Sequence, residues 1–226
     1  RDLHTAYRRQ CQMCIRDSAS VESKEKFGFT WTNNHISPAT EAANHKLITG
    51  FFDHISIKNT KSYLEEIFEI CHFKFNKQEY KIRKNAELKL KWENELNRIS
   101  KGKKIVGLNT GCGPRWKTRL WPKENWVLLI QKLESQGYFC LILGGEAEAE
   151  ANKYYAKKTG AFYPGHFSLE EFISLTDVCD LIVTQVSLMM HIAIALQKEM
   201  ILMNNIFNSN EFELYGRGEI VQPSSG

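Results

Sequence analysis

Two stretches of this chain have the same build: NTGCGPRWKTRLWPKENW at residues 109–126 and TQVSLMMHIAIAL at residues 184–196. In each, an apolar strand ends in a small or polar turn, and a helical pattern follows. In an open α/β sheet such turns lie at the carboxyl edge, where ligands bind. Backbone N–H groups and the helix dipole at these turns favour phosphate. The sequence therefore predicts a protein that binds a phosphorylated ligand, and a nucleotide sugar fits best.

The composition is that of an ordinary globular protein. The 226 residues allow one large or two small domains, and 42 % of them are hydrophobic and 25 % charged. The net charge of +4 is modest, so we expect no nucleic-acid partner. Since no apolar run approaches the roughly 18 residues of a membrane helix and no secretory signal is visible, we expect a cytoplasmic location.

The first 18 residues, RDLHTAYRRQCQMCIRDS, have no apolar periodicity, and we expect them to be non-native or disordered. Cys11 and Cys14 form a C-x-x-C pair, which suggests a metal or redox site only with a second Cys pair or a redox-type fold. Neither accompanies it, so we expect no metal. The other cysteines are expected to be reduced and mostly buried: Cys71, Cys112, Cys140 and Cys179.

Residues 19–99 are expected to form a partial N-terminal domain. FGFTWT at 27–32 indicates a strand, Ser37–Pro38 resembles a cap-then-proline helix start, and three helical stretches follow: 39–50, 60–72 and 85–99. The polar sequence SKGKK at 100–104 is typical of a linker. We therefore predict a domain boundary between residues 99 and 100.

Residues 100–226 alternate regularly between apolar strands and amphipathic helices, and we expect them to form the nucleotide-sugar-binding domain. Continuous apolar strands such as YFCLIL suit a parallel sheet covered on both faces. This predicts an α/β, doubly wound, Rossmann-like domain. The expected strands are 104–109, 138–143, 161–163, 180–184, 199–203 and 219–223, and the expected helices are 123–136, 146–158, 169–177 and 187–196.

The first turn combines glycines with cations. Gly111 and Gly113 have G-x-G spacing, but Trp116 stands where a dinucleotide fingerprint needs its third glycine, which argues against a dehydrogenase. The cations of the turn are Arg115, Lys117 and Arg119. They could neutralise a diphosphate as it leaves. A solvated basic loop before a helix that starts at Pro122 explains them equally well, and both interpretations stay open.

The other two strand ends carry further candidates. Ser187 is placed to cap a helix and to hold a phosphate together with the amides after it. His191 lies one turn later, where a lone His is more often a packed core residue than a catalyst. At LGGEAEAEA, residues 143–151, one of three glutamates could accept hydrogen bonds from ribose, while simple solvation at a helix start accounts for the others.

Together these segments resemble glycosyltransferase family 9, the lipopolysaccharide heptosyltransferase family. The likeness covers about residues 27–226. It includes a basic loop followed by Trp-Pro, a strand ending in Gly-Gly, and a late strand that runs into a helix with Met-His. In this sequence these are VGLNTGCGPRWKTRLWPKENW, LILGGEAEAE and VSLMMHIAIAL, with FSLEEFISL at 167–175 between the last two.

The resemblance implies a GT-B-like fold of two facing Rossmann-like domains, in which residues 19–99 would be the acceptor-side domain and residues 100–226 the donor-side domain. It also implies inverting, metal-independent transfer of a sugar, typically heptose, from an ADP-sugar to a lipid A–core or other saccharide acceptor. The resemblance implies no cofactor. It also implies peripheral contact of the protein with the inner face of the membrane. Carried over residue by residue, the donor-binding positions are Asn109, Thr110, Gly111, Lys117, Arg119, Gly145, Glu150, Gln185, Ser187 and His191.

The sequence departs from the family pattern in two places. Where the family has Asp-Ser/Thr-Gly, this chain has Val186-Ser187-Leu188, and Leu cannot let a ligand approach the backbone as closely as Gly can. The general base of the family is expected upstream of residue 19. We therefore expect a fragment, truncated at both ends, that turns over little. The alternatives are a non-catalytic binding or scaffold protein of the same fold, and a transferase that uses a UDP- or GDP-sugar.

Overall fold

The computed structural model describes residues 15–113 and 119–223. The chain folds into two compact units. The first unit runs up to Gln78 and includes Asn208–Glu213, and the second consists of Glu79–Phe207 and the chain from Leu214 onward. Each unit therefore contains residues from two separate stretches of the sequence.

The second unit is built on a five-stranded parallel sheet in the order β4-β3-β5-β6-β7. Its strands are β3 (Ile105–Asn109), β4 (Phe139–Leu143), β5 (Leu181–Gln185), β6 (Glu199–Met203) and β7 (Gly218–Val221). A single parallel bridge, Leu141 to Phe162, extends the sheet beyond β4. After β3 the chain forms β4 on one side of β3, and later β5 on the other side. The order reverses between β3 and β5, which is the switch point of a doubly wound sheet.

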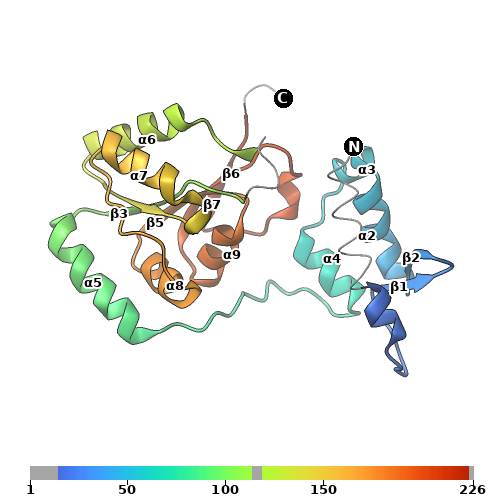
Figure 1. Ribbon diagram of the computed structural model, residues 1–226. Helices are drawn as coiled ribbons and strands as arrows, with labels where there is room; N and C mark the ends of the chain where they lie inside the picture. Colours follow the sequence, from blue (N-terminus) through green and yellow to red (C-terminus); the bar gives the residue numbers. More distant parts are fainter. Residues whose placement is uncertain (1–14, 114–118, 224–226) are drawn as a thin grey trace. The chain divides into compact units, whose positions relative to one another are not determined.

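Helices cover both faces of this sheet (Figure 1). On one face, Trp126 of α6 and Tyr155 of α7 pack against Val106, Leu108 and Cys140 of the sheet. On the other face, α9 packs against β5 and β6, α8 against α9, and α5 against α8. The helices of the second unit are α5 (Ala86–Ser100), α6 (Lys123–Ser135), α7 (Ala149–Lys158), α8 (Leu169–Asp177) and α9 (Leu188–Ala195), and the 3₁₀ turn η2 (Glu146–Glu148) precedes α7. The predicted α/β, doubly wound fold is confirmed.

Gly107 lies in the middle of β3, between β4 and β5, where there is no room for a side chain. A Cβ built on Gly107 would lie 2.7 Å from Cδ1 of Ile182, 2.8 Å from Sγ of Cys179 and 2.9 Å from Cδ1 of Leu143. Close-packed interiors relax only partly around an added methyl group. The glycine therefore lets three neighbouring apolar groups meet over the strand.

The first unit contains a β-hairpin, three helices and one 3₁₀ turn among the elements whose bounds the structure gives. These are β1 (Phe29–Thr32), β2 (His35–Pro38), α2 (Glu41–Phe51), α3 (Asp53–Ser56), α4 (Tyr63–Ile70) and η3 (Ser209–Glu211). The carboxylate of Glu66 is buried among them and accepts a hydrogen bond of 2.6 Å from Lys46. The side-chain amide of Asn208 donates to the backbone oxygens of Ser56 and Asn59, which fastens the 208–213 segment to this unit.

Two sequence-based expectations differ from the structure. The predicted helix start at Ser37–Pro38 is wrong, because both residues belong to β2 and α2 begins at Glu41. The cause is a tight turn at Asn33 and Asn34, whose φ angles of 50° and 60° close a hairpin that pairs Pro38 with Phe29. The expected short strand at 161–163 is reduced to the single bridge at Phe162.

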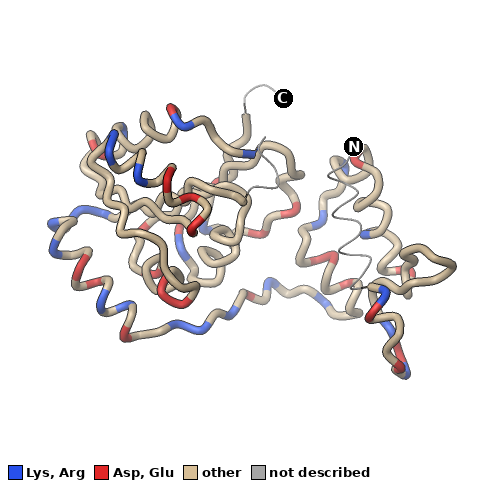
Figure 2. The backbone as a smooth tube through the Cα atoms, in the orientation of Figure 1, with Lys and Arg blue, Asp and Glu red and all other residues tan. Residues whose placement is uncertain are grey.

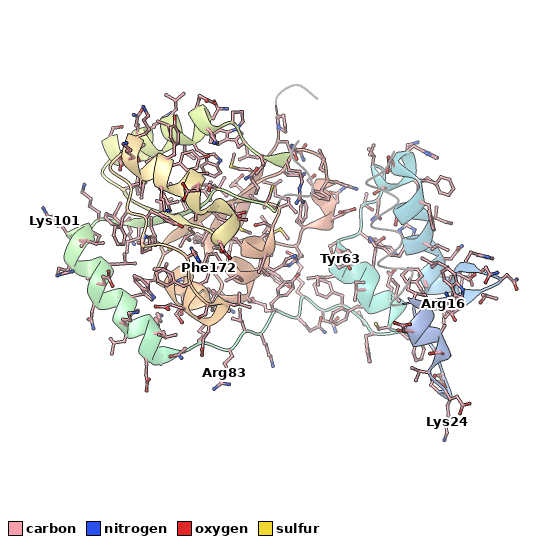
Figure 3. The ribbon with its side chains drawn as sticks, in the orientation of Figure 1. Arg16, Lys24, Tyr63, Arg83, Lys101 and Phe172 are labelled. Carbon is pink, nitrogen blue, oxygen red and sulfur yellow. The ribbon has the colours of Figure 1, made fainter. Side chains whose placement is uncertain are left out.

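The compact units divide at residues 78/79, whereas the sequence placed the domain boundary at 99/100. The reason is α5, which packs against α8 and therefore lies in the second unit. This helix ends at Ser100, and its C-cap is Lys101, labelled in Figure 3, which has a left-handed φ of 53°. The acceptor-side and donor-side roles of the two predicted domains stay predictions. The segment 1–18 lies mostly outside the described residues.

Cys112, Cys140 and Cys179 are buried free thiols, as predicted, while Cys71 is exposed. Burial raises the pKa of Cys140 and of Cys179 to about 12. Cys11 and Cys14 lie outside the described residues. Among the helices that the structure describes, none is long and apolar enough to cross a bilayer.

Three lysines of the second unit surround the buried carboxylate of Asp177 at the end of α8. Its oxygens lie 3.3 Å from Nζ of Lys84, 3.3 Å from Nζ of Lys89 and 3.4 Å from Nζ of Lys198. Burial alone would raise the pKa of Asp177, but the three ammonium groups together lower it. Elsewhere along α5 and the segment before it, charges of both signs are interspersed (Figure 2). Asp177 thus links α8 to α5, to the segment before α5 and to the start of β6.

We expect Asp177→Asn to lower the free energy of unfolding by about 3 kcal/mol at pH 7, because it leaves three cations around a neutral buried group. The folded state lowers the pKa of Asp177. The stabilisation is therefore complete above the pKa of the unfolded chain, about 3.9, and is lost as the pH falls from there through the lower pKa of the folded state. Urea unfolding at pH 7 and pH 3 measures both effects. Glu93→Gln, which removes a partly exposed partner of Lys89, should cost less than about 1 kcal/mol and serves as the control.

Candidate functional site at the switch point

The two turns singled out in the sequence meet at the carboxyl ends of β3 and β5. Asn109 is the register partner of Thr184 in the parallel sheet. The side-chain amide nitrogen of Asn109 lies 3.1 Å from Oγ1 of Thr184, 3.3 Å from Oγ of Ser187 and 2.8 Å from the backbone oxygen of Gly111. Asn109 and Thr184 are both buried. One amide group therefore bridges the first turn and the second.

Ser187 caps α9, as the sequence predicted. Its backbone is extended, and its hydroxyl accepts a hydrogen bond of 3.3 Å from the backbone N–H of Met189. The same hydroxyl lies 3.3 Å from Oγ1 of Thr184. The helix that follows is short and apolar, with Met189, Met190 and Ile192 buried. The cap and the buried face together hold the amino end of α9 beside the end of β3.

Gln185, the last residue of β5, joins the two ends of the β3–α6 loop. Its Nε2 donates to the backbone oxygen of Thr110 at 3.1 Å, and its Oε1 accepts from the backbone N–H of Trp121 at 3.0 Å. The side chain is 2 % exposed. Both the nitrogen and the oxygen of this amide are thus bound to the protein itself. Direct contact of Gln185 with a nucleotide sugar stays a prediction.

Arg119 folds back onto the first turn. Its guanidinium donates a hydrogen bond of 2.7 Å to the backbone oxygen of Cys112 and lies 5.5 Å from the ring of Phe207. Its Nε is buried and has no hydrogen-bond partner among the described atoms. Burial raises the pKa of the Cys112 thiol, and the charge of Arg119 opposes this shift. The cation is therefore held next to the β3 turn.

The other predicted cations of this loop, Arg115 and Lys117, lie outside the described residues, as does Trp116. Their contribution to donor binding stays a prediction. Within residues 15–113 and 119–223, no three His, Cys, Asp or Glu side chains gather as metal ligands would.

At the end of β4, Glu148 faces the first turn more closely than Glu150 does. Glu148 accepts a hydrogen bond of 3.0 Å from the backbone N–H of Gly145, and a Cβ built on Gly111 would lie 2.3 Å from Cγ of Glu148. The side chain of Glu150 is 88 % exposed and pairs with Lys153 at 2.7 Å. The structure thus brings Gly145 and Glu148 to the site, and Glu150 lies apart from it.

Asn152 also supports the first turn, although the sequence pattern did not single it out. Its Oδ1 accepts a hydrogen bond of 2.6 Å from Oγ1 of Thr110, and its Nδ2 donates to the backbone oxygen of Leu143 at 3.4 Å. Asn152 is completely buried. The signal available in the sequence was an Asn near the start of the helix that follows Gly144-Gly145.

His191 is exposed rather than packed in the core. Its ring stacks on the ring of Tyr80, with the centroids 5.9 Å apart and the planes 15° apart. Removal of water from part of the ring lowers the pKa of His191, which favours the neutral imidazole at pH 7. The structure thus gives Tyr80 as a contact of the His191 ring, and a role of His191 in binding the sugar donor stays a prediction.

Comparison with known proteins identifies the family of this chain. The model of glycosyltransferase family 9 (heptosyltransferase) matches residues 26–216. This chain belongs to glycosyltransferase family 9. The hydrogen bonds of Asn109 and Gln185 at the switch point thus occur in a family 9 chain, which has a GT-B-like fold.

Several solved structures of family 9 proteins and heptosyltransferases resemble the chain. The family 9 glycosyltransferase of Veillonella parvula DSM 2008 is 14 % identical, with a TM-score of 0.60 over 74 % of this chain and 50 % of that protein. E. coli ADP-heptose lps heptosyltransferase II is 19 % identical, with a TM-score of 0.51 over 65 % of this chain and 46 % of that one. E. coli heptosyltransferase WaaC with ADP-2-deoxy-2-fluoro heptose is 15 % identical, with a TM-score of 0.50 over 70 % and 47 %.

The family 9 chain therefore spans about half the length of the solved structures that it matches. At these identities the similarity establishes the fold alone. A search of the curated proteins finds no match.

We expect Gln185→Leu to destabilise the second unit by about 2 kcal/mol, because it leaves a buried carbonyl and a buried N–H without partners. The backbone amide of Trp121 should exchange with solvent faster in this variant. Hydrogen exchange of that amide and the melting temperature measure the two effects. Gln136→Leu, at an exposed position after α6, is the control. Equal exchange at Trp121 in both variants would show that Gln185 does not hold the loop.

Proposed function

We propose that this chain is the donor-binding part of a transferase that moves heptose from an ADP-sugar to a saccharide acceptor of the lipopolysaccharide core. The observation that carries the proposal is the bridge from Asn109 to the β5 turn, with Arg119 held beside it. Membership of family 9 supports the reaction class. The E. coli proteins that share the fold are described with ADP-heptose or an ADP-heptose analogue, which supports the donor.

The proposed chemistry is an inverting displacement without a metal. As the bond between sugar and phosphate breaks, negative charge accumulates on the ADP diphosphate. Arg119 and the backbone amides of the two turns would stabilise that charge. Thr110 and Gly111 would line the diphosphate, and a carboxylate of the β4 end would accept hydrogen bonds from the ribose. In this role we favour Glu148 over Glu150, because Glu148 packs against Gly111.

The acceptor hydroxyl must lose its proton as it attacks the sugar. A positioned general base contributes about 10² to 10⁴-fold to such a step, and the proposed reaction requires one. We include in the proposal an acceptor on lipid A, which would bring the protein from the cytoplasm to the inner face of the membrane.

We expect the chain to bind ADP more tightly than UDP or GDP, and Arg119→Ala to weaken ADP binding between about 10-fold and 100-fold. The reason is that a charge-assisted hydrogen bond contributes about 1.5 to 3 kcal/mol. Isothermal titration calorimetry with the three nucleotides measures this. Arg98→Ala removes an exposed cation of α5 and should leave the affinity unchanged. An equal loss in the two variants would mean that the effect is one of net charge.

A second candidate function is a binding or scaffold protein of the same fold without transfer activity. Leu188 favours it, because the first residue of α9 carries an apolar side chain that is 61 % exposed at the edge of the site. A side chain at this position would hinder the approach of a diphosphate to the backbone amides at the start of α9. Val186, which stands where the family has an acidic residue, favours the same interpretation.

The scaffold hypothesis predicts that Leu188→Gly tightens ADP-sugar binding at least about 10-fold, because glycine opens the approach to the backbone. The measurement is a titration of ADP-heptose into both proteins. Leu128→Gly provides the matched control, since Leu128 lies on α6 and is 63 % exposed. An affinity within about 3-fold of the original in Leu188→Gly would contradict the scaffold hypothesis and leave the transferase proposal in place.

A further inference from the structure

The segment 79–84, which we call the entry strap, leads into α5 without regular secondary structure and is fastened at both ends. At its start, the carboxylate of Glu79 accepts two hydrogen bonds of 3.0 Å from Arg217 and one of 2.6 Å from Gln197. At its end, Lys84 pairs with the buried Asp177. Directly before Lys84, Arg83 points away from the sheet into solvent (Figure 3).

Tyr80 follows directly after the Glu79 anchor. Gln197, which binds Glu79, lies just beyond the end of α9, and His191 lies on α9 itself. The strap therefore places the Tyr80 ring over this helix, parallel to the imidazole of His191. A centroid distance of 5.9 Å and an interplanar angle of 15° are within the range of offset-stacked aromatic pairs.

We infer that Tyr80 is a positioning residue, which holds the His191 imidazole for a hydroxyl of the transferred sugar. The inference rests on the proposed function. His191 is the fourth residue of α9, one turn beyond the Ser187 cap, and it is exposed. A stacked ring has fewer rotamers to lose when a ligand binds, so the cost of ordering it is already met in the free protein.

The chemistry of the imidazole selects the sugar rather than the diphosphate. Loss of water around the ring lowers the pKa of His191, and no charged group contributes to this shift among the described residues. A neutral imidazole offers one N–H donor and one acceptor nitrogen. A sugar hydroxyl also donates and accepts, so the two are complementary. A diphosphate only accepts, and Arg119 already supplies a cation on the β3 side.

The test compares Tyr80→Ala and Tyr80→Phe with the unchanged chain. NMR titration of the His191 imidazole, without ligand, should show a higher pKa in Tyr80→Ala and little change in Tyr80→Phe, which keeps the stack. Calorimetry should show ADP-heptose binding weakened about 5-fold in Tyr80→Ala, in line with the energy of an aromatic pair, and ADP binding unchanged. In a His191→Ala background the Tyr80→Ala change should have no further effect.

An unaltered titration of His191 in Tyr80→Ala would overturn the inference. So would an equal loss for ADP and ADP-heptose, or a loss that persists in the His191→Ala background, because each would indicate a purely structural role for Tyr80. If the unchanged chain binds neither ADP nor ADP-heptose, the proposed function fails, and the sugar ligand proposed for His191 fails with it. The ligand-free titration still decides whether Tyr80 holds the imidazole.

Discussion

Asn109 donates hydrogen bonds across the switch point, and the geometry of the candidate site depends on them. The residue is buried, so water cannot satisfy its amide, and the partners must come from the protein. They come from Thr184, Ser187 and the turn of Asn109 itself. A buried donor without a partner costs about 1 to 3 kcal/mol. The two turns are therefore held in one arrangement by the need to satisfy a single side chain.

Gln185 extends the same constraint to the loop that carries Arg119. Since its amide binds Thr110 on one side and Trp121 on the other, the start and the end of the loop are fixed to β5. Arg119 lies just before Trp121 and returns to the carbonyl of Cys112. The position of the cation thus depends on buried neutral hydrogen bonds rather than on a carboxylate partner.

The sequence predicted the elements whose signals are local. Strands such as β4 and β5 are continuous apolar runs, α6 begins after Pro122, and Ser187 is a helix cap recognisable from its neighbours. It could not distinguish Glu148 from Glu150, because the 3₁₀ turn η2 shifts the phase of the side chains before α7 begins. Tyr80 and the placement of α5 were missed for a related reason. Both depend on contacts with residues far along the chain, and no local pattern reports them.

The crowding at Gly107 of β3 affects the position of the carboxyl end of this strand, where the candidate site lies. Three apolar groups meet where its side chain would be, two residues before Asn109. Even a methyl group there would push β3 away from its neighbours and shift Asn109 against Thr184. Under the proposed function, such a variant would bind the nucleotide more weakly, although residue 107 is not among the proposed ligand contacts. The ligand-binding edge is therefore sensitive to a position that a map of ligand contacts would leave out.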